Sequence, residues 1–160
     1  MGTAAQSNEN SSDSTPPAGT FSAEERAAMK QRAAELKAEG RRGRAEDKAA
    51  AEKDAFLAKI AEMPSSDRAM AERLHAVVAD AAPELLPKLY YGQPGWAKDG
   101  KVVVFFRSGL GDKERYSTLG FSSAANLDDG SGLWSTSYAL DHLDDAGAAA
   151  IALLVAKAVS

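Results

Sequence analysis

A run of five apolar residues at 102–106, VVVFF, limits what this chain can fold into more than any other feature. Asp99-Gly100 precedes the run, and this dipeptide favours the type I′ turn of a β-hairpin. Because side chains alternate along a strand, the run places apolar groups on both faces. A strand that is apolar on both faces is typical of the interior of a sheet, so we expect residues 102–107 at the centre of an antiparallel sheet.

Three other segments have the pattern of strands. Trp96-Ala97 forms the first arm of the hairpin, and we expect Gln93-Pro94-Gly95 to make the turn that delivers Trp96 to the sheet. Residues 116–121 and 133–140 follow, and in the second of these large side chains alternate with small ones. The connections are short, so neighbouring strands are antiparallel. The sequence therefore predicts a four-stranded antiparallel sheet.

Helices are predicted before and after these strands. Residues 67–82 have apolar side chains at helical spacing. Residues 146–159 have the same pattern, and Asp144 or Asp145 can cap the N-terminus of this closing helix. A helix, four strands and a helix make an α+β domain over residues 64–160.

Two extensions precede that domain. Residues 1–21 are mostly polar, so they bury too little to offset the entropy of ordering, and we expect a disordered tail. Residues 22–63 have helical composition with a Gly-Arg-Arg-Gly-Arg joint at 40–44, which predicts a helical hairpin. Its first helix has only Met29 and Leu36 as large apolar residues, so its docking would be weak.

Composition excludes several classes of function. The chain has no cysteine, which rules out disulfides, zinc–thiolate sites and thiolate nucleophiles, and fits a reducing cytoplasm. The first residues do not have the pattern of a secretory signal, and no apolar run is long enough to span a membrane, so no membrane partner is expected. Nucleophile-elbow, dinucleotide-binding and phosphate-loop motifs are also absent, so we expect a protein that is not an enzyme.

Several short segments in this order carry a family resemblance: RLHAVVADAAPE, YYGQPGW, DGKVVVFF and a late strand ending in YAL. The chain resembles the YdhG-like family over residues 66–160. Members of that family are often described as iron chaperones or frataxin-like proteins. The resemblance implies a small bacterial cytoplasmic protein with a twisted sheet packed by helices. It also implies binding of Fe(II) for delivery to iron–sulfur or haem assembly proteins.

Acidic residues dominate the last quarter of the chain, which contains five aspartates and only one lysine. Carboxylates with an imidazole suit Fe(II) and other hard divalent cations. The candidate metal ligands are Asp128, Asp129, Asp141, His142, Asp144 and Asp145. The alternative is that the first two belong to a turn and the last two cap the closing helix.

Aromatic residues gather in and around the predicted strands. Aromatic side chains with a few polar groups are typical of small-ligand pockets. The candidate pocket residues are Tyr90, Tyr91, Trp96, Phe105, Tyr116, Trp134 and Tyr138. The alternative is that helices cover this face and make it core. The sequence thus leaves two hypotheses, an acidic iron site and an aromatic face that binds a small ligand or a protein partner.

A basic cluster at 41–44 raises the question of nucleic acid. The segment around it is nearly neutral and has no interleaved aromatics, so a solvated hinge is the interpretation and nucleic acid is not an expected partner.

Overall fold

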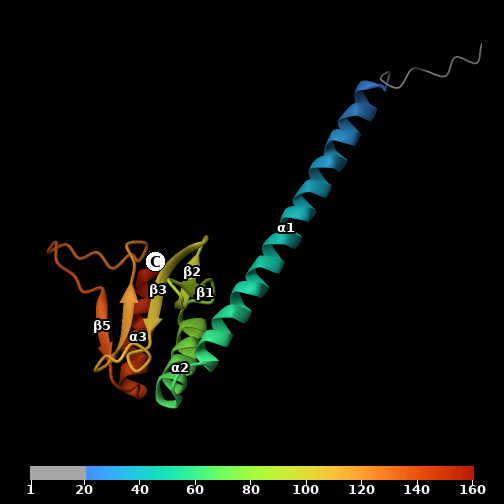
Figure 1. The fold of residues 1–160 in the computed structure, drawn as a ribbon. Coiled ribbons are helices and arrows are strands. Elements are labelled where there is room, and N and C mark those ends of the chain that lie inside the picture. The colour runs from blue at the N-terminus through green and yellow to red at the C-terminus, as the bar shows by residue number, and fades with distance from the viewer. Residues whose placement is uncertain (1–20) are drawn as a thin grey trace, which may run out of the picture. The chain divides into compact units, whose positions relative to one another are not determined.

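The computed structural model describes residues 21–160 (Figure 1). The chain divides into two units, the first ending at Gly43 and the second spanning Arg44–Ser160. The predicted tail, residues 1–21, lies outside the described residues except for Phe21. None of the helices in the described part of the chain is long and apolar enough to cross a membrane.

Helix α1 (Ala23–Ala61) is one continuous helix, so the predicted helical hairpin over residues 22–63 is wrong. Neither Gly40 nor Gly43 has the positive φ that would end a helix. Each glycine costs a helix about 1 kcal/mol, but the alanine and arginine residues around them are strong helix formers. The start of α1 agrees with the sequence, because the Ser22 hydroxyl accepts a hydrogen bond from the Glu25 backbone N–H at 3.1 Å.

The second unit contains one antiparallel sheet of five strands, one more than predicted, in the order β1-β2-β3-β4-β5. The strands are β1 (Leu86–Tyr90), β2 (Gln93–Lys98), β3 (Lys101–Arg107), β4 (Ser117–Phe121) and β5 (Ser137–Leu140). β3 contains the VVVFF run and is the central strand, as predicted. β1 was not expected, because Pro87 and Lys88 interrupt the apolar pattern of a strand.

Two tight turns set the register of the first three strands. Asp99 and Gly100 have φ of 52° and 80°, which confirms the predicted type I′ turn between β2 and β3. Tyr91 and Gly92 have φ of 48° and 77°, the same left-handed pair, between β1 and β2. The predicted turn at Gln93-Pro94-Gly95 is therefore wrong, since these residues lie within β2.

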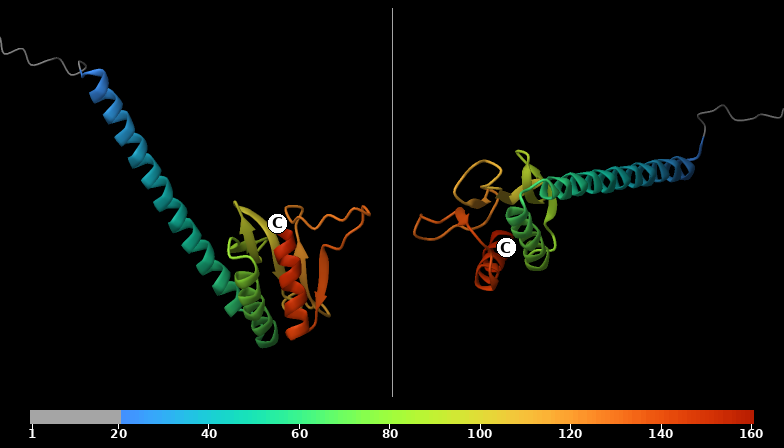
Figure 2. Two further views of the ribbon diagram at one scale, coloured as in Figure 1. Left: turned by 180° about the vertical axis from the view of Figure 1, so that it is seen from behind. Right: turned by 60° about the horizontal axis from the view of Figure 1, so that its bottom comes forward.

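Two helices cover one face of this sheet (Figure 2). They are α2 (Ser65–Ala81) and α3 (Asp145–Ala158), close to the predicted positions. The Asp144 carboxylate accepts a hydrogen bond from the Gly147 backbone N–H at 2.8 Å, so the expected cap of the last helix is present.

The core lies between the helices and this face. Trp96, Val104, Phe106 and Leu119 supply its sheet side, and all four are almost completely buried. Phe56, from the part of α1 that belongs to the second unit, is also fully buried. Burying one side chain of this kind contributes about 1.5–3 kcal/mol, so the alternate residues of β2, β3 and β4 provide much of the stability. Neither α2 nor α3 covers the opposite face of the sheet (Figure 2).

Candidate functional site

The six predicted metal ligands are divided between the two ends of α3. Asp144 and Asp145 stand at its N-terminus. The loop with Asp128 and Asp129 lies at the other end, where the Asn126 backbone N–H donates to the Ala158 carbonyl. A helix of 14 residues is about 20 Å long, too long for one ion to bridge. The predicted six-residue site is therefore not assembled.

Most of these carboxylates have partners within the protein. Asp129 accepts a hydrogen bond from the Ser131 backbone N–H at 3.0 Å, and this bond is the main cause of its lowered pKa. Asp145 pairs with Arg73 at 2.5 Å. Asp129 thus has the turn role of the alternative interpretation, whereas Asp145 is in an ion pair with α2 and the cap of α3 is Asp144 alone.

His142 lies next to two of the carboxylates, 3.6 Å from Asp141 and 3.9 Å from Asp144. All three side chains are exposed, and the described residues contain no group of three or more His, Asp or Glu side chains placed to hold a metal ion. The iron-chaperone role and its assembly partners thus stay predictions without an assembled ligand set.

The sheet separates the predicted aromatic pocket into different environments. Trp96 faces the helices and is 1% exposed, and Tyr138 packs against Phe121 with ring centroids 6.1 Å apart. Trp134 lies in the loop before β5 and Tyr116 just before β4, both about 40% exposed. These four residues therefore do not share a pocket.

Trp96 belongs to a small aromatic cluster in the core. Its indole N–H donates to Nδ1 of His75 at 3.1 Å, and Phe56 packs 4.9 Å from the imidazole and 5.3 Å from the indole. Burial, with a smaller contribution from Lys53, lowers the pKa of His75. His75 is thus a packed structural residue, and His142 is not in contact with it.

The other three aromatic residues come together on the open face of the sheet. The rings of Tyr90 and Phe105 lie 5.0 Å apart, and those of Tyr90 and Tyr91 lie 4.6 Å apart. Tyr91 is 90% exposed, so its ring is available to a partner. These rings form one wall of a groove of about 500 Å³, which we call the aromatic groove. Its lining residues are Tyr90, Tyr91, Gln93, Phe105, Arg107 and Asp112.

A glycine on a neighbouring strand makes room for the Phe105 ring. In the register of the sheet, Gly95 of β2 and Gly120 of β4 stand opposite Phe105. A Cβ on Gly120 would lie 2.2 Å from Cζ of Phe105, so the ring rests directly on this glycine. The absence of a side chain at Gly120 therefore fixes where the Phe105 ring lies.

The polar side of the aromatic groove is an ion pair. The Arg107 Nε–H donates to the Asp112 carboxylate at 2.6 Å, and this hydrogen bond raises the pKa of Arg107. The guanidinium therefore stays charged, and its charge is balanced locally by Asp112.

Gln93 has an unusual state in the groove. Its Oε1 atom is buried, and the described residues offer it no hydrogen-bond partner. Leaving a buried acceptor unsatisfied costs about 1–3 kcal/mol, so such atoms are uncommon in native proteins. Gln93 and Asp112 also line a second hollow of about 140 Å³, together with Lys59, Glu62 and Met63.

Sequence reasoning found the three aromatic rings of the groove but missed its polar residues. Arg107 was within reach, because it follows Phe105 by two residues on the same strand and so shares its face. For Gln93 the sequence pattern predicts a turn. Asp112 comes from the loop between β3 and β4, whose course has no sequence signal.

The chain was also compared with known proteins. No protein-family model, curated protein or solved structure matches it. The resemblance to the YdhG-like family therefore stays a prediction, and function is inferred from the site itself.

Proposed function

We propose that the protein is a non-enzymatic binding protein whose aromatic groove holds a small, neutral, planar ligand. The observation that carries this proposal is the convergence of three aromatic rings in one groove that is also lined by the polar side chains of Gln93, Arg107 and Asp112. Aromatic walls with a few placed polar groups are the usual composition of small-ligand sites, and 500 Å³ lies within their usual size.

The chemistry of the lining residues specifies the ligand. Tyr90, Tyr91 and Phe105 offer ring faces and edges, which favour a flat, unsaturated molecule. The side-chain amide of Gln93 lines the groove and can donate or accept a hydrogen bond, so the ligand carries a hydrogen-bonding group. Arg107 and Asp112 neutralise each other, which favours an uncharged molecule over an ion.

A fragment screen followed by NMR tests the proposal on the full chain. The probes are uncharged aromatic heterocycles that carry an N–H donor. We expect the backbone amide signals of Tyr91, Gln93 and Phe105 to shift on binding, because these residues surround the ligand. Tyr91→Ala should weaken binding by about tenfold, since it removes one ring face.

Tyr116→Ala is the matched control, because Tyr116 is an exposed tyrosine that does not line the aromatic groove. It should leave fragment affinity unchanged. Fragments that bind Tyr91→Ala as well as the wild type, or that shift only signals outside the groove, would rule out the proposed site.

A further inference from the structure

Basic side chains gather on one side of α1 within the first unit. At about 100° per residue, Arg26, Lys30, Lys37 and Arg41 fall within about 60° of one another around the helix. Glu35 lies on the opposite side, as does Glu39, four residues further along. We call the four basic residues the basic stripe.

The first unit has no net charge, so its composition does not reveal the basic stripe. Residues 1–43 contain six basic and six acidic residues, so the unit is neutral and the net charge of −4 belongs entirely to residues 44–160. A nearly neutral composition was the reason that nucleic acid was not an expected partner. Because α1 is one continuous helix, however, its basic and acidic side chains lie on different faces, and one face is basic even though the unit is neutral.

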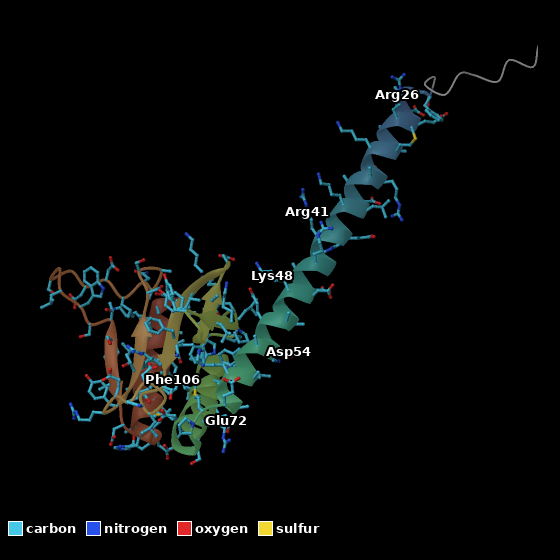
Figure 3. All side chains as sticks on the ribbon, viewed as in Figure 1. Arg26, Arg41, Lys48, Asp54, Glu72 and Phe106 are labelled. Atoms are coloured by element: carbon cyan, nitrogen blue, oxygen red, sulfur yellow. The ribbon has the colours of Figure 1, made fainter. Side chains whose placement is uncertain are left out.

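The basic stripe is open to solvent. All four side chains are exposed, and Figure 3 labels Arg26 and Arg41 along the helix. Among the described residues, Lys30, Lys37 and Arg41 are in no ion pair, whereas Arg32, on another face, pairs with Glu35 at 3.4 Å. Three cations of the stripe are therefore free to pair with an external anion.

The partner must be a long anion. The 16 residues from Arg26 to Arg41 extend for about 22 Å along the helix axis. A nucleic-acid duplex has one phosphate charge per about 1.7 Å of its axis, so several phosphates lie within reach. A membrane surface fits less well, because helices that lie in membranes need a bulky apolar face and this segment of α1 has only Met29 and Leu36.

We propose that the basic stripe of α1 binds the phosphate backbone of a nucleic-acid duplex without reading its sequence. Contacts to phosphates position a protein but do not read bases, and the small alanines beside the stripe let the helix approach the backbone closely. The negative charge of residues 44–160 repels phosphate, which confines the contact to this helix face. The aromatic groove has no part in it.

The test is fluorescence anisotropy of a labelled DNA duplex of mixed sequence, titrated with the full chain over a salt series. We expect the logarithm of the association constant to fall linearly with that of the salt concentration, with a slope of about −3 to −4 for four phosphate contacts. Lys37→Gln with Arg41→Gln should weaken binding at least about tenfold and reduce the slope by about 2.

The matched control is Arg32→Gln with Arg42→Gln, which removes the same charge from other faces of the same helix and should change affinity less than about threefold. Circular dichroism confirms that both variants keep their helix. Equal losses in the two variants, no binding at low salt, or binding to phosphatidylserine vesicles with none to the duplex would each overturn the proposal.

Discussion

The indole N–H of Trp96 donates a hydrogen bond to Nδ1 of His75 at 3.1 Å, which ties β2 to α2 in the core. Nδ1 can accept this bond only while it carries no proton. Phe56 of α1 packs against both rings, so a change at His75 alters the packing between α1, α2 and the sheet.

Stability should therefore depend on pH through His75. Its pKa in the folded protein lies below the unfolded value of 6.5, so below that pH the unfolded chain binds the extra proton more readily. The contribution of neutral His75 is complete above pH 6.5 and is lost as the pH falls toward the folded pKa. Urea denaturation at a series of pH values measures this, and His75→Gln should flatten the dependence between neutral and mildly acidic pH. An unchanged dependence in that variant would exclude His75 as its source.

Gly120→Ala should destabilise the protein by about 1–3 kcal/mol, because the new Cβ would overlap the Phe105 ring. The Phe105 ring must move to avoid the overlap. Because this ring lines the aromatic groove, the variant should also lose affinity for ligands of the groove. Gly130→Ala is the control, since a Cβ there meets no atom within 4 Å. Chemical denaturation compares the two, and equal stabilities would show that Phe105 does not depend on Gly120.

Asp67→Ala should cost about 2–4 kcal/mol. The Asp67 carboxylate is 4% exposed and accepts hydrogen bonds from the Ser108 hydroxyl at 2.5 Å and the Leu110 backbone N–H at 3.1 Å. Its removal leaves two donors without this partner, and bonds to a charged acceptor are among the stronger ones. Asp80→Ala, an exposed change at the other end of α2, should cost less than about 0.5 kcal/mol. The difference in denaturation midpoint between these variants checks the prediction.

Asp144→Ala should cost about 1 kcal/mol through loss of the cap on α3. Asp141→Ala removes a neighbouring exposed carboxylate that makes no cap, so its effect should be smaller. If Asp141→Ala were as destabilising as Asp144→Ala in a thermal melt, helix capping would not explain the role of Asp144.

The sequence predicted the parts of the fold whose signals are local. The hairpin around Asp99-Gly100 and the cap at Asp144 depend on neighbouring residues alone, and the central position of the VVVFF strand follows from its own apolar pattern on both faces. The predicted break in α1 is wrong because the strong helix formers around Gly40 and Gly43 offset the free-energy cost of two glycines in a helix. The sequence does not predict β1, because residues 86–90 lack the pattern of a strand and form one only through pairing with β2.

The candidate site was only partly predictable, because the sequence does not give the register of the sheet. Trp96 and Phe105 both lie in predicted strands and both are large aromatics. They point to opposite faces, since Phe105 stands opposite Gly95, the residue before Trp96. A shift of one residue in the pairing of β2 with β3 decides whether an aromatic side chain lies in the core or in the groove, and only the structure shows that pairing.

The order of strands in the sheet also bears on how the chain folds. Each strand pairs with the strand that precedes it along the chain. Such pairing joins strands that are neighbours in sequence, so the entropy of loop closure is modest and folding should be fast for a sheet. During synthesis each strand can join the sheet as it leaves the ribosome. α3, which follows β5, completes the cover of the apolar face only afterwards. A chain released without α3 would therefore leave part of this apolar face exposed to other molecules.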